Sequence, residues 1–376
     1  MKMKLIKYPL LMLLCVPLFG FAMDKPASLP NEDDILWVSP EMKAFVSDKK
    51  YDRKGRETRM NTLLQDIVSS EGLHFKYDAN ITLTASEAFV QKRGNCLTFA
   101  YLYTALAREL RLDARFNRVD VPPKYSSHGK LVVETKHINV LIRIGADYYA
   151  VDLLPFYRDI LVCDTDIIDD QKAFSSYYSN LGVDALSRED METAGRLFER
   201  AYSLNDEYIG NLRNLGLFCR INKDYSKSEK YLKAALNLNE RDSMVYYLLS
   251  ELYKDMGDFK QSEYCLDMAH KYRKSNPFYY YANALEDIAL NDWYSAEYNL
   301  QKAVSLYDRC HYLYYDLALV YERLGKIEET EKALQMAIVC ASTDDLEQRY
   351  RDVMKALKQR YHNSQPFDSG YTIAMR

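Results

Sequence analysis

The sequence is poor in the residues that build flexible linkers and tight loops, since its 376 residues include only 13 Gly and 10 Pro. These counts exclude a collagen-like or linker-dominated chain and leave little room for glycine-rich phosphate-binding loops. An excess of one charge is also lacking, because 50 Lys and Arg stand against 54 Asp and Glu, a net charge of −4. No basic field therefore indicates a nucleic-acid partner. Tyrosine, by contrast, occurs 33 times beside 2 Trp, and the length predicts two or three domains.

The first 22 residues have the pattern of a secretory signal peptide. Lys2, Lys4 and Lys7 form a basic start, and a mostly apolar run from Leu10 to Phe21 ends before Ala22. This run is shorter than the ~20 residues that a membrane-spanning helix needs, and no later stretch qualifies as a span. We expect cleavage after Ala22 and export to the periplasm or the medium, with an uncleaved signal anchor as the alternative.

The cysteines are scattered and show no CxxC spacing. Export favours disulfides, yet a chain of this size does not need them to fold. Four cysteines are interpreted first as buried apolar residues and second as disulfide candidates, namely Cys219, Cys265, Cys310 and Cys340, and their pairing with one another or with Cys163 stays open. No spacing of His, Cys and Asp predicts a metal site, and no cofactor is expected.

The second half of the chain repeats itself at an interval of 34 residues. Small residues recur in phase at Ala201, Ala235, Ala269, Ala303 and Ala337. Large apolar residues recur in phase at Phe198, Leu232, Leu266, Leu300 and Leu334. Small side chains let paired helices cross closely, and large ones fill the space between units, so the pattern predicts a stack of antiparallel helix pairs.

This pattern resembles the tetratricopeptide (TPR) family in its length and in its order of small and large residues. The resemblance implies an all-α solenoid of five helical hairpins over residues 175–344. A capping helix at 345–362 and a tail at 363–376 would follow.

Several aromatic residues of the repeats fall on positions that face the concave side in this family, and these are Tyr247, Phe278, Tyr281, Tyr312 and Tyr315. An aromatic groove would favour an extended polypeptide or glycan. The alternative is that many of these rings only pack between helices. The paired Lys and Asn residues by which chaperone-binding members clamp a C-terminal carboxylate do not occur here, so we expect no partner of that class.

Residues 23–170 show a mixed pattern rather than helical repeats. Apolar residues on one face predict a helix over 57–70, and another amphipathic helix is expected over Leu97 to Leu110. Asn95 is a candidate N-cap, which places Cys96 in the first turn of that helix. The positive end of a helix and a nearby imidazole lower the pKa of a thiol, so Cys96 is a candidate nucleophile.

The imidazole and a carboxylate are predicted to come from a β-hairpin. His137 opens one apolar strand, Asp152 ends the next, and Gly145-Ala146 lies between them. A two-residue loop pairs positions whose numbers sum to an odd value, which puts His137 and Asp152 on one face. Asp152 would then orient the ring of His137 while the other ring nitrogen faces Cys96.

Gly-Asn-Cys96 at a helix start, His137 opening a strand and Asp152 in Tyr-Tyr-Ala-Val-Asp resemble the transglutaminase-like superfamily of papain-like α+β fold. The resemblance implies a Cys-His-Asp triad that acts on amide bonds, by hydrolysis or by acyl transfer, without a cofactor. Gln91 would be an oxyanion-stabilising amide as in papain-like enzymes, although a solvated glutamine is the favoured interpretation.

The sequence thus predicts an exported cysteine-dependent amide-bond enzyme, a peptidase or amide hydrolase or transamidase, joined to a TPR array. The array would recruit a polypeptide substrate or an envelope protein. The alternative keeps the two folds without the chemistry, as a scaffold for protein–protein interactions in the cell envelope.

Overall fold

The computed structural model describes residues 31–48, 51, 54–128, 131–153, 165–341 and 344–362, and for 48, 120–128, 131–136, 165, 344–346, 361 and 362 it describes the backbone alone. The expected signal peptide, Cys163 and the tail at 363–376 lie outside these residues. No helix in the described ranges combines the length and the apolar character that crossing a membrane requires.

Short helices and a small sheet form the N-terminal part. Its helices are α1 (Glu32–Ile35), α2 (Pro40–Asp48), α3 (Arg56–Val68), α4 (Ala85–Gln91) and α5 (Cys96–Glu109). Its strands are β1 (Lys76–Tyr77), β2 (Arg93–Gly94), β3 (Asp113–His128), β4 (Leu131–Ile144), β5 (Asp147–Val151) and β6 (Thr165–Ile168). The last four form one antiparallel sheet in the order β5-β4-β3-β6, while β1 and β2 pair in parallel.

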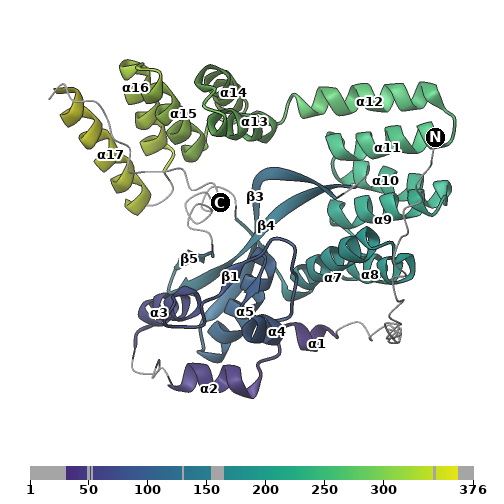
Figure 1. Cartoon of the computed structure of the whole chain (residues 1–376), viewed down its shortest axis with the longest axis horizontal. Coiled ribbons are helices and arrows are strands. Elements are labelled where there is room, and N and C mark those ends of the chain that lie inside the picture. Colours follow the sequence, from purple (N-terminus) through teal and green to yellow (C-terminus); the bar gives the residue numbers. More distant parts are fainter. Residues whose placement is uncertain are drawn as a thin grey trace, which may run out of the picture.

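The expected helices and hairpin of this part are confirmed. Helix α3 buries Met60, Leu63 and Ile67 on one face, as the periodicity predicted. Strands β4 and β5 pair as Val140 with Val151, so the two-residue loop has the odd-sum register that the sequence indicated. The sequence did not predict the length of β3 and β4, which continue past a register shift after Val119 as a two-stranded ribbon directed toward the repeats (Figure 1).

The second half is a TPR-like helical-repeat solenoid. Its helices are α7 (Asp170–Ser187), α8 (Met191–Leu204), α9 (Ile209–Ile221), α10 (Tyr225–Leu238), α11 (Ser243–Asp255), α12 (Phe259–Arg273), α13 (Pro277–Ala289), α14 (Trp293–Leu306), α15 (His311–Arg323), α16 (Ile327–Val339) and α17 (Asp344–His362). They form five hairpins followed by α17, which packs on α16. The first helix begins five residues before the predicted 175, because the Asp169 side chain caps it by accepting a hydrogen bond from the Lys172 amide.

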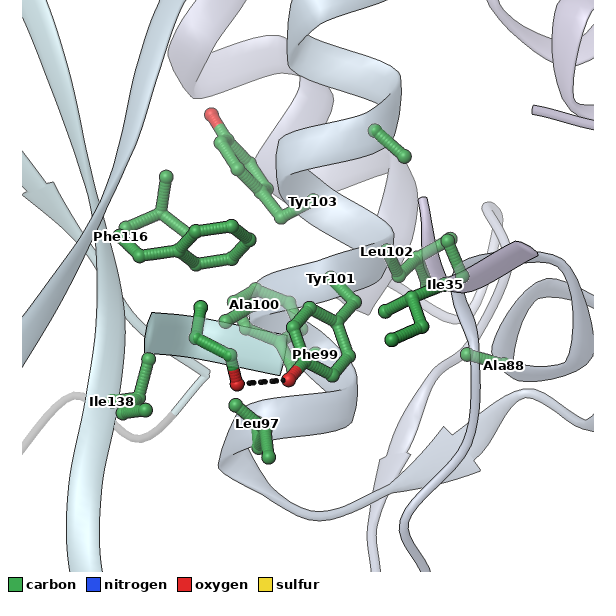
Figure 2. Packing of buried hydrophobic residues seen from close by; sticks show 14 of the residues in the cluster. Ile35, Ala88, Leu97, Phe99, Ala100, Tyr101, Leu102, Tyr103, Phe116 and Ile138 are labelled. Atoms are coloured by element: carbon green, nitrogen blue, oxygen red, sulfur yellow. Dashed lines mark hydrogen bonds between the residues drawn. The ribbon is translucent and has the colours of Figure 1, made fainter. Parts of the chain in front are cut away.

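Helix α5 is the centre of the N-terminal core. Figure 2 shows Phe116 and Ile138 from the sheet packed against this helix, with Ile35 and Ala88 nearby from α1 and α4. The same core continues without a break into α7, α8 and Leu215 of α9. The N-terminal part and the first helical hairpin are therefore packed as one unit.

Candidate functional site

The backbone at the start of α5 is shaped by Gly94, Asn95 and Thr98. Gly94 has a φ of +156°, and a Cβ there would lie 2.3 Å from Cγ2 of Thr98, so only glycine fits. Asn95 is the N-cap, as predicted, and its Oδ1 accepts a hydrogen bond of 3.0 Å from the Thr98 amide. Cys96 is thereby fixed as the first residue of α5.

A loop before α4 secures this turn by further hydrogen bonds. The Ile81 carbonyl accepts from the Asn95 amide at 2.9 Å and from the Thr98 hydroxyl at 3.2 Å. The Thr98 Oγ1 accepts in turn from the Leu83 amide at 2.9 Å, and Asn95 Nδ2 donates to the Thr82 hydroxyl at 2.8 Å. Every one of these groups is partnered, so the position of the Cys96 backbone is well determined.

His137 and Asp152 lie together beside this turn, on neighbouring strands. Nε2 of His137 is hydrogen-bonded to Oδ2 of Asp152. Both side chains are buried, at 5 % and 2 % exposure. Because Nε2 faces Asp152, the other ring nitrogen, Nδ1, is the one left for Cys96.

The Cys96 thiol completes the cluster. It is hydrogen-bonded to His137 and to the backbone amide of Ile138, and it is 8 % exposed. The structure therefore brings Cys96, His137 and Asp152 together, and these three residues are called the triad below.

The electrostatics of the triad favour a thiolate beside an imidazolium. Burial raises the pKa of the Cys96 thiol, but the hydrogen bond and charge of His137 outweigh it, so that pKa falls below its ordinary value. Burial lowers the pKa of His137, but hydrogen bonds to Asp152 and Cys96 outweigh it and raise that pKa to about 10. A thiolate at a helix N-terminus is the reactive form of cysteine, so the arrangement is suited to nucleophilic attack on a carbonyl.

Gln91 lies at the last position of α4 with an exposed side chain. Its oxyanion role stays a prediction. The backbone N–H groups at the start of α5 are an alternative source of hydrogen bonds to an oxyanion, because the amides of the first helical turn have no acceptor within the helix.

The aromatic groove prediction is wrong for two of its five residues. Tyr281 and Tyr312 are buried inside the solenoid, with ring centroids 5.4 Å apart, and so cannot face a partner. Phe278 packs on Tyr307, and Tyr315 stacks on Tyr350 of α17 at 5.0 Å. Tyr247 remains 40 % exposed. Most of these rings occupy helix contacts, which was the alternative interpretation of the sequence.

Contacts between α5 and α7 were not foreseen from the sequence. The Tyr101 hydroxyl donates to the Ala173 carbonyl at 2.7 Å, in the middle of α5. At its end, Arg108 makes a bidentate contact with Asp170 at 2.6 and 2.8 Å. Asn180 Nδ2 of α7 donates to the Thr82 hydroxyl at 3.3 Å, in the loop before α4 that holds the Asn95 N-cap. The first repeat helix therefore contacts α5 at its middle and at its end, and also contacts the loop that secures the start of α5; no local sequence signal marks these long-range contacts.

A buried amide pair lies next to the triad and was also missed. Asn117 Nδ2 donates to Asn139 Oδ1 at 2.9 Å across the β3–β4 pair, and Asn139 is two residues from His137 on the same strand. Asn139, a polar residue inside the apolar run Ile138–Ile142, was the available signal, since alternation places it on the same face as His137.

The cysteines outside the triad are not linked by disulfides within the described residues. Cys219, Cys265 and Cys310 are buried and Cys340 is partly buried, in agreement with their interpretation as small apolar residues. Among the described side chains, no group of three or more His, Cys, Asp and Glu is arranged to hold a metal ion.

No family model matches the chain, and no curated protein matches it. Solved structures of TPR proteins are similar to its helical half. One is a thermophilic TPR protein of Thermus thermophilus, at 22 % identity over 48 % of this chain and 99 % of that one, with a TM-score of 0.25. Another is yeast Tom70, at 17 % identity over 53 % of this chain and 45 % of that one, with a TM-score of 0.29.

A third is YrrB, described as a TPR protein with an unusual peptide-binding site, at 13 % identity over 47 % of this chain and 92 % of that one, with a TM-score of 0.25. A match to the Cut9–Hcn1 complex spans only 37 % of that chain. Similarity at this level says nothing about what this chain binds.

Proposed function

We propose that the protein is a cysteine-dependent amide-bond enzyme of transglutaminase-like type, in which Cys96 is the nucleophile, His137 the acid and base, and Asp152 the orienting carboxylate. The observation that carries the proposal is the hydrogen-bonded chain from Asp152 through His137 to a thiol at a helix N-terminus. A buried structural cysteine needs neither the imidazole nor the carboxylate.

The reaction follows from the protonation states. The Cys96 thiolate attacks the carbonyl carbon of an amide, and the oxyanion that forms accepts hydrogen bonds from backbone N–H groups at the start of α5. The imidazolium of His137 gives its proton to the leaving nitrogen, the C–N bond breaks, and an amine departs. The product on the enzyme is a thioester.

The second half of the reaction restores the enzyme. His137, now neutral, takes a proton from water or from an acceptor amine, whose lone pair attacks the thioester carbonyl. Collapse of this intermediate releases an acid or a new amide and returns the thiolate beside the imidazolium. No other co-reactant is needed.

The solenoid is proposed to recruit the polypeptide that is cut or modified, or an envelope protein. TPR-like solenoids expose long surfaces that suit polypeptide partners. We also propose that the chain acts outside the cytoplasm, because its first residues have the signal-peptide pattern.

A scaffold without chemistry is the second candidate. It is favoured by the low exposure of Cys96 and by the solenoid, which fills more than half of the described chain. The two candidates differ in the ionisation of Cys96, which is measurable without a substrate.

The test is the alkylation rate of Cys96 at about pH 6.5, read by mass spectrometry of its peptide, with Cys340 in the same molecule as the control thiol. We expect Cys96 to react at least about tenfold faster than a model thiol, and His137→Ala to remove this advantage. The ultraviolet absorbance of the thiolate is a second measurement, which does not depend on the access of a reagent to Cys96. We expect this absorbance to be lost on acidification and to be absent in Cys96→Ala. A Cys96 that reacts no faster than a model thiol, shows no thiolate absorbance and is unchanged by His137→Ala would falsify the enzyme proposal.

The reaction is then identified by comparing extracellular and periplasmic proteins from cells with wild type or Cys96→Ala. Clipped peptides, deamidated glutamines and isopeptide cross-links each name a different reaction.

A further inference from the structure

The solenoid is interrupted between its third and fourth helical hairpins. Helices α12 and α13 scarcely touch, whereas the other successive hairpins pack on one another (Figure 1). The apolar core of the earlier repeats ends at Cys265 of α12, and a separate core begins at Tyr281 of α13. We call this break, with its connector at residues 274–276, the joint.

The joint leaves an apolar face of α12 uncovered. Leu266 is 38 % exposed, although the residues at the same repeat position, Leu232, Leu300 and Leu334, are at most 1 % exposed. Phe259 is 71 % exposed, although the equivalent Trp293 is partly buried. The position in the repeat identifies what would normally cover this face, namely the first helix of the next hairpin, which here is α13.

The sequence itself weakens the joint. Asn283 of α13 stands at the position that a leucine fills in the other four hairpins. Leu215, Leu249 and Leu317 are buried there, and Leu181 of the first hairpin is partly buried. Asn283 is only partly buried. Replacing a buried leucine by an amide removes apolar contact area from this one interface, so α13 docks less strongly than its counterparts do.

Helix α13 instead lies against β3. That strand pairs with β4, which carries His137. The connector has three residues, one fewer than at 239–242, but α12 is one residue longer than α10. Helix α13 therefore begins 18 residues after the start of α12, as α11 does after the start of α10, and the connector does not prevent α13 from reaching α12.

We propose that the joint is a hinge with two states: an open one, with α13 on β3, and a closed one in which α13 docks on the Phe259 and Leu266 face of α12. Closure makes the solenoid continuous and releases β3 from α13. The occupant of the α12 face is thus α13 of the same chain, held nearby by a short connector at high effective concentration. The hinge does not depend on the chemistry proposed for Cys96.

The test compares two single variants of the full chain with wild type. Asn283→Leu restores the missing leucine and is expected to close the joint, whereas Leu266→Asp places a charge on the α12 face and is expected to hold it open. Hydrogen exchange of peptides from α12 and small-angle scattering read the outcome. We expect α12 amides to exchange roughly tenfold more slowly in Asn283→Leu than in Leu266→Asp, with wild type between them, and the two variants to differ in radius of gyration.

Three results would overturn the proposal. The first is identical exchange and scattering in both variants. The second is a wild type already as protected on α12 as on α10, which would mean that the joint does not open. The third is protection that rises with protein concentration, which would assign the face to a second copy. If Leu266→Asp fails to fold, Leu266→Ser takes its place, and the closing variant Asn283→Leu is read independently.

Discussion

The N-terminal part and the solenoid each bury a cysteine, a histidine and an aspartate, but their side chains have different partners. In the solenoid these are Cys310, His311 and Asp316. His311 Nδ1 is hydrogen-bonded to the hydroxyl of Tyr350 at 2.7 Å, and Asp316 accepts a hydrogen bond of 2.6 Å from the hydroxyl of Tyr281. In the triad, by contrast, the histidine bonds to the carboxylate and to the thiol. Tyrosine hydroxyls thus hold His311 and Asp316, whereas His137 is held by a carboxylate and a thiol.

The two clusters also differ in charge. Burial raises the pKa of Asp316 to about 6, and the hydrogen bond from a neutral phenol offsets this only in part. In the triad, the mutual contacts raise the pKa of His137 and lower that of Cys96. Burial thus moves the solenoid carboxyl toward its neutral form, while the triad retains an ion pair. Tyrosine supplies the neutral partners, which explains part of its abundance in the repeats.

Asp152→Asn and Asp316→Asn test this difference most strongly. Asp152→Asn removes the carboxylate that stabilises the His137 imidazolium, so the thiolate fraction of Cys96 falls, and its alkylation at about pH 6 slows roughly 10- to 100-fold. Asp316→Asn leaves the rate within about twofold, because it lies outside the triad. Mass spectrometry of the Cys96 peptide measures both. Equal effects of the two variants would remove the distinction between the clusters.

Alanine substitutions at two glycines compare how tightly the backbone is packed in the two regions. Gly94→Ala brings a Cβ against Thr98, whose hydroxyl is held by Ile81 and Leu83, and should cost about 2–4 kcal/mol of unfolding free energy. Gly257→Ala, at a repeat turn with φ +80° and nothing within 4 Å, should cost about 1 kcal/mol for the backbone conformation alone. Urea unfolding measures both. A Gly94 variant no less stable than the Gly257 variant would show that Thr98 moves aside.

Local patterns were sufficient to predict the elements that carry the site. Asn95 before an amphipathic run placed the N-cap and the first turn of α5, and Gly145-Ala146 fixed the register of β4 and β5. Together these predicted that His137 and Asp152 share a face, and the two side chains are in contact. Such inferences succeed because helix caps and two-residue turns are determined by neighbours in sequence.

Features set by distant contacts were not predictable in this way. The 34-residue interval is unbroken across the joint, so periodicity alone gives no sign of it, and only Asn283 departs from the pattern. The burial of Tyr281 depends on Asp316 of the next hairpin, which provides a polar partner inside the solenoid. The support that α7 gives to α5 and to the loop before α4 depends on residues about 60 to 100 positions apart, as Arg108 with Asp170 and Thr82 with Asn180 illustrate.

The raised pKa of Asp316 makes the stability of the solenoid dependent on pH. The folded pKa of about 6 lies above the ordinary value of 3.8, so the folded state binds more protons between these values, and stability falls as pH rises from about 4 to 6. The loss is roughly 2–3 kcal/mol, complete above the folded pKa and absent below about pH 4. Asp316→Asn should remove it. The check is the difference in unfolding free energy between variant and wild type at several pH values, and a difference that does not change with pH would contradict a raised pKa.

The smallest expected effect is the difference in stability between removing the hydroxyl of a buried tyrosine and removing that of an exposed one. Tyr281→Phe removes the donor to Asp316 and leaves that carboxylate buried with less compensation, so it should cost about 1–2 kcal/mol at pH 7. Tyr247→Phe, at an exposed position, should change stability by less than about 0.5 kcal/mol. Urea unfolding at pH 7 and again near pH 4 measures both variants. Near pH 4 Asp316 is protonated and depends less on the phenol hydrogen bond, so Tyr281→Phe should lower the unfolding free energy by less there than at pH 7. An equal loss at both pH values would mean that the phenol stabilises the fold by packing rather than by its hydrogen bond.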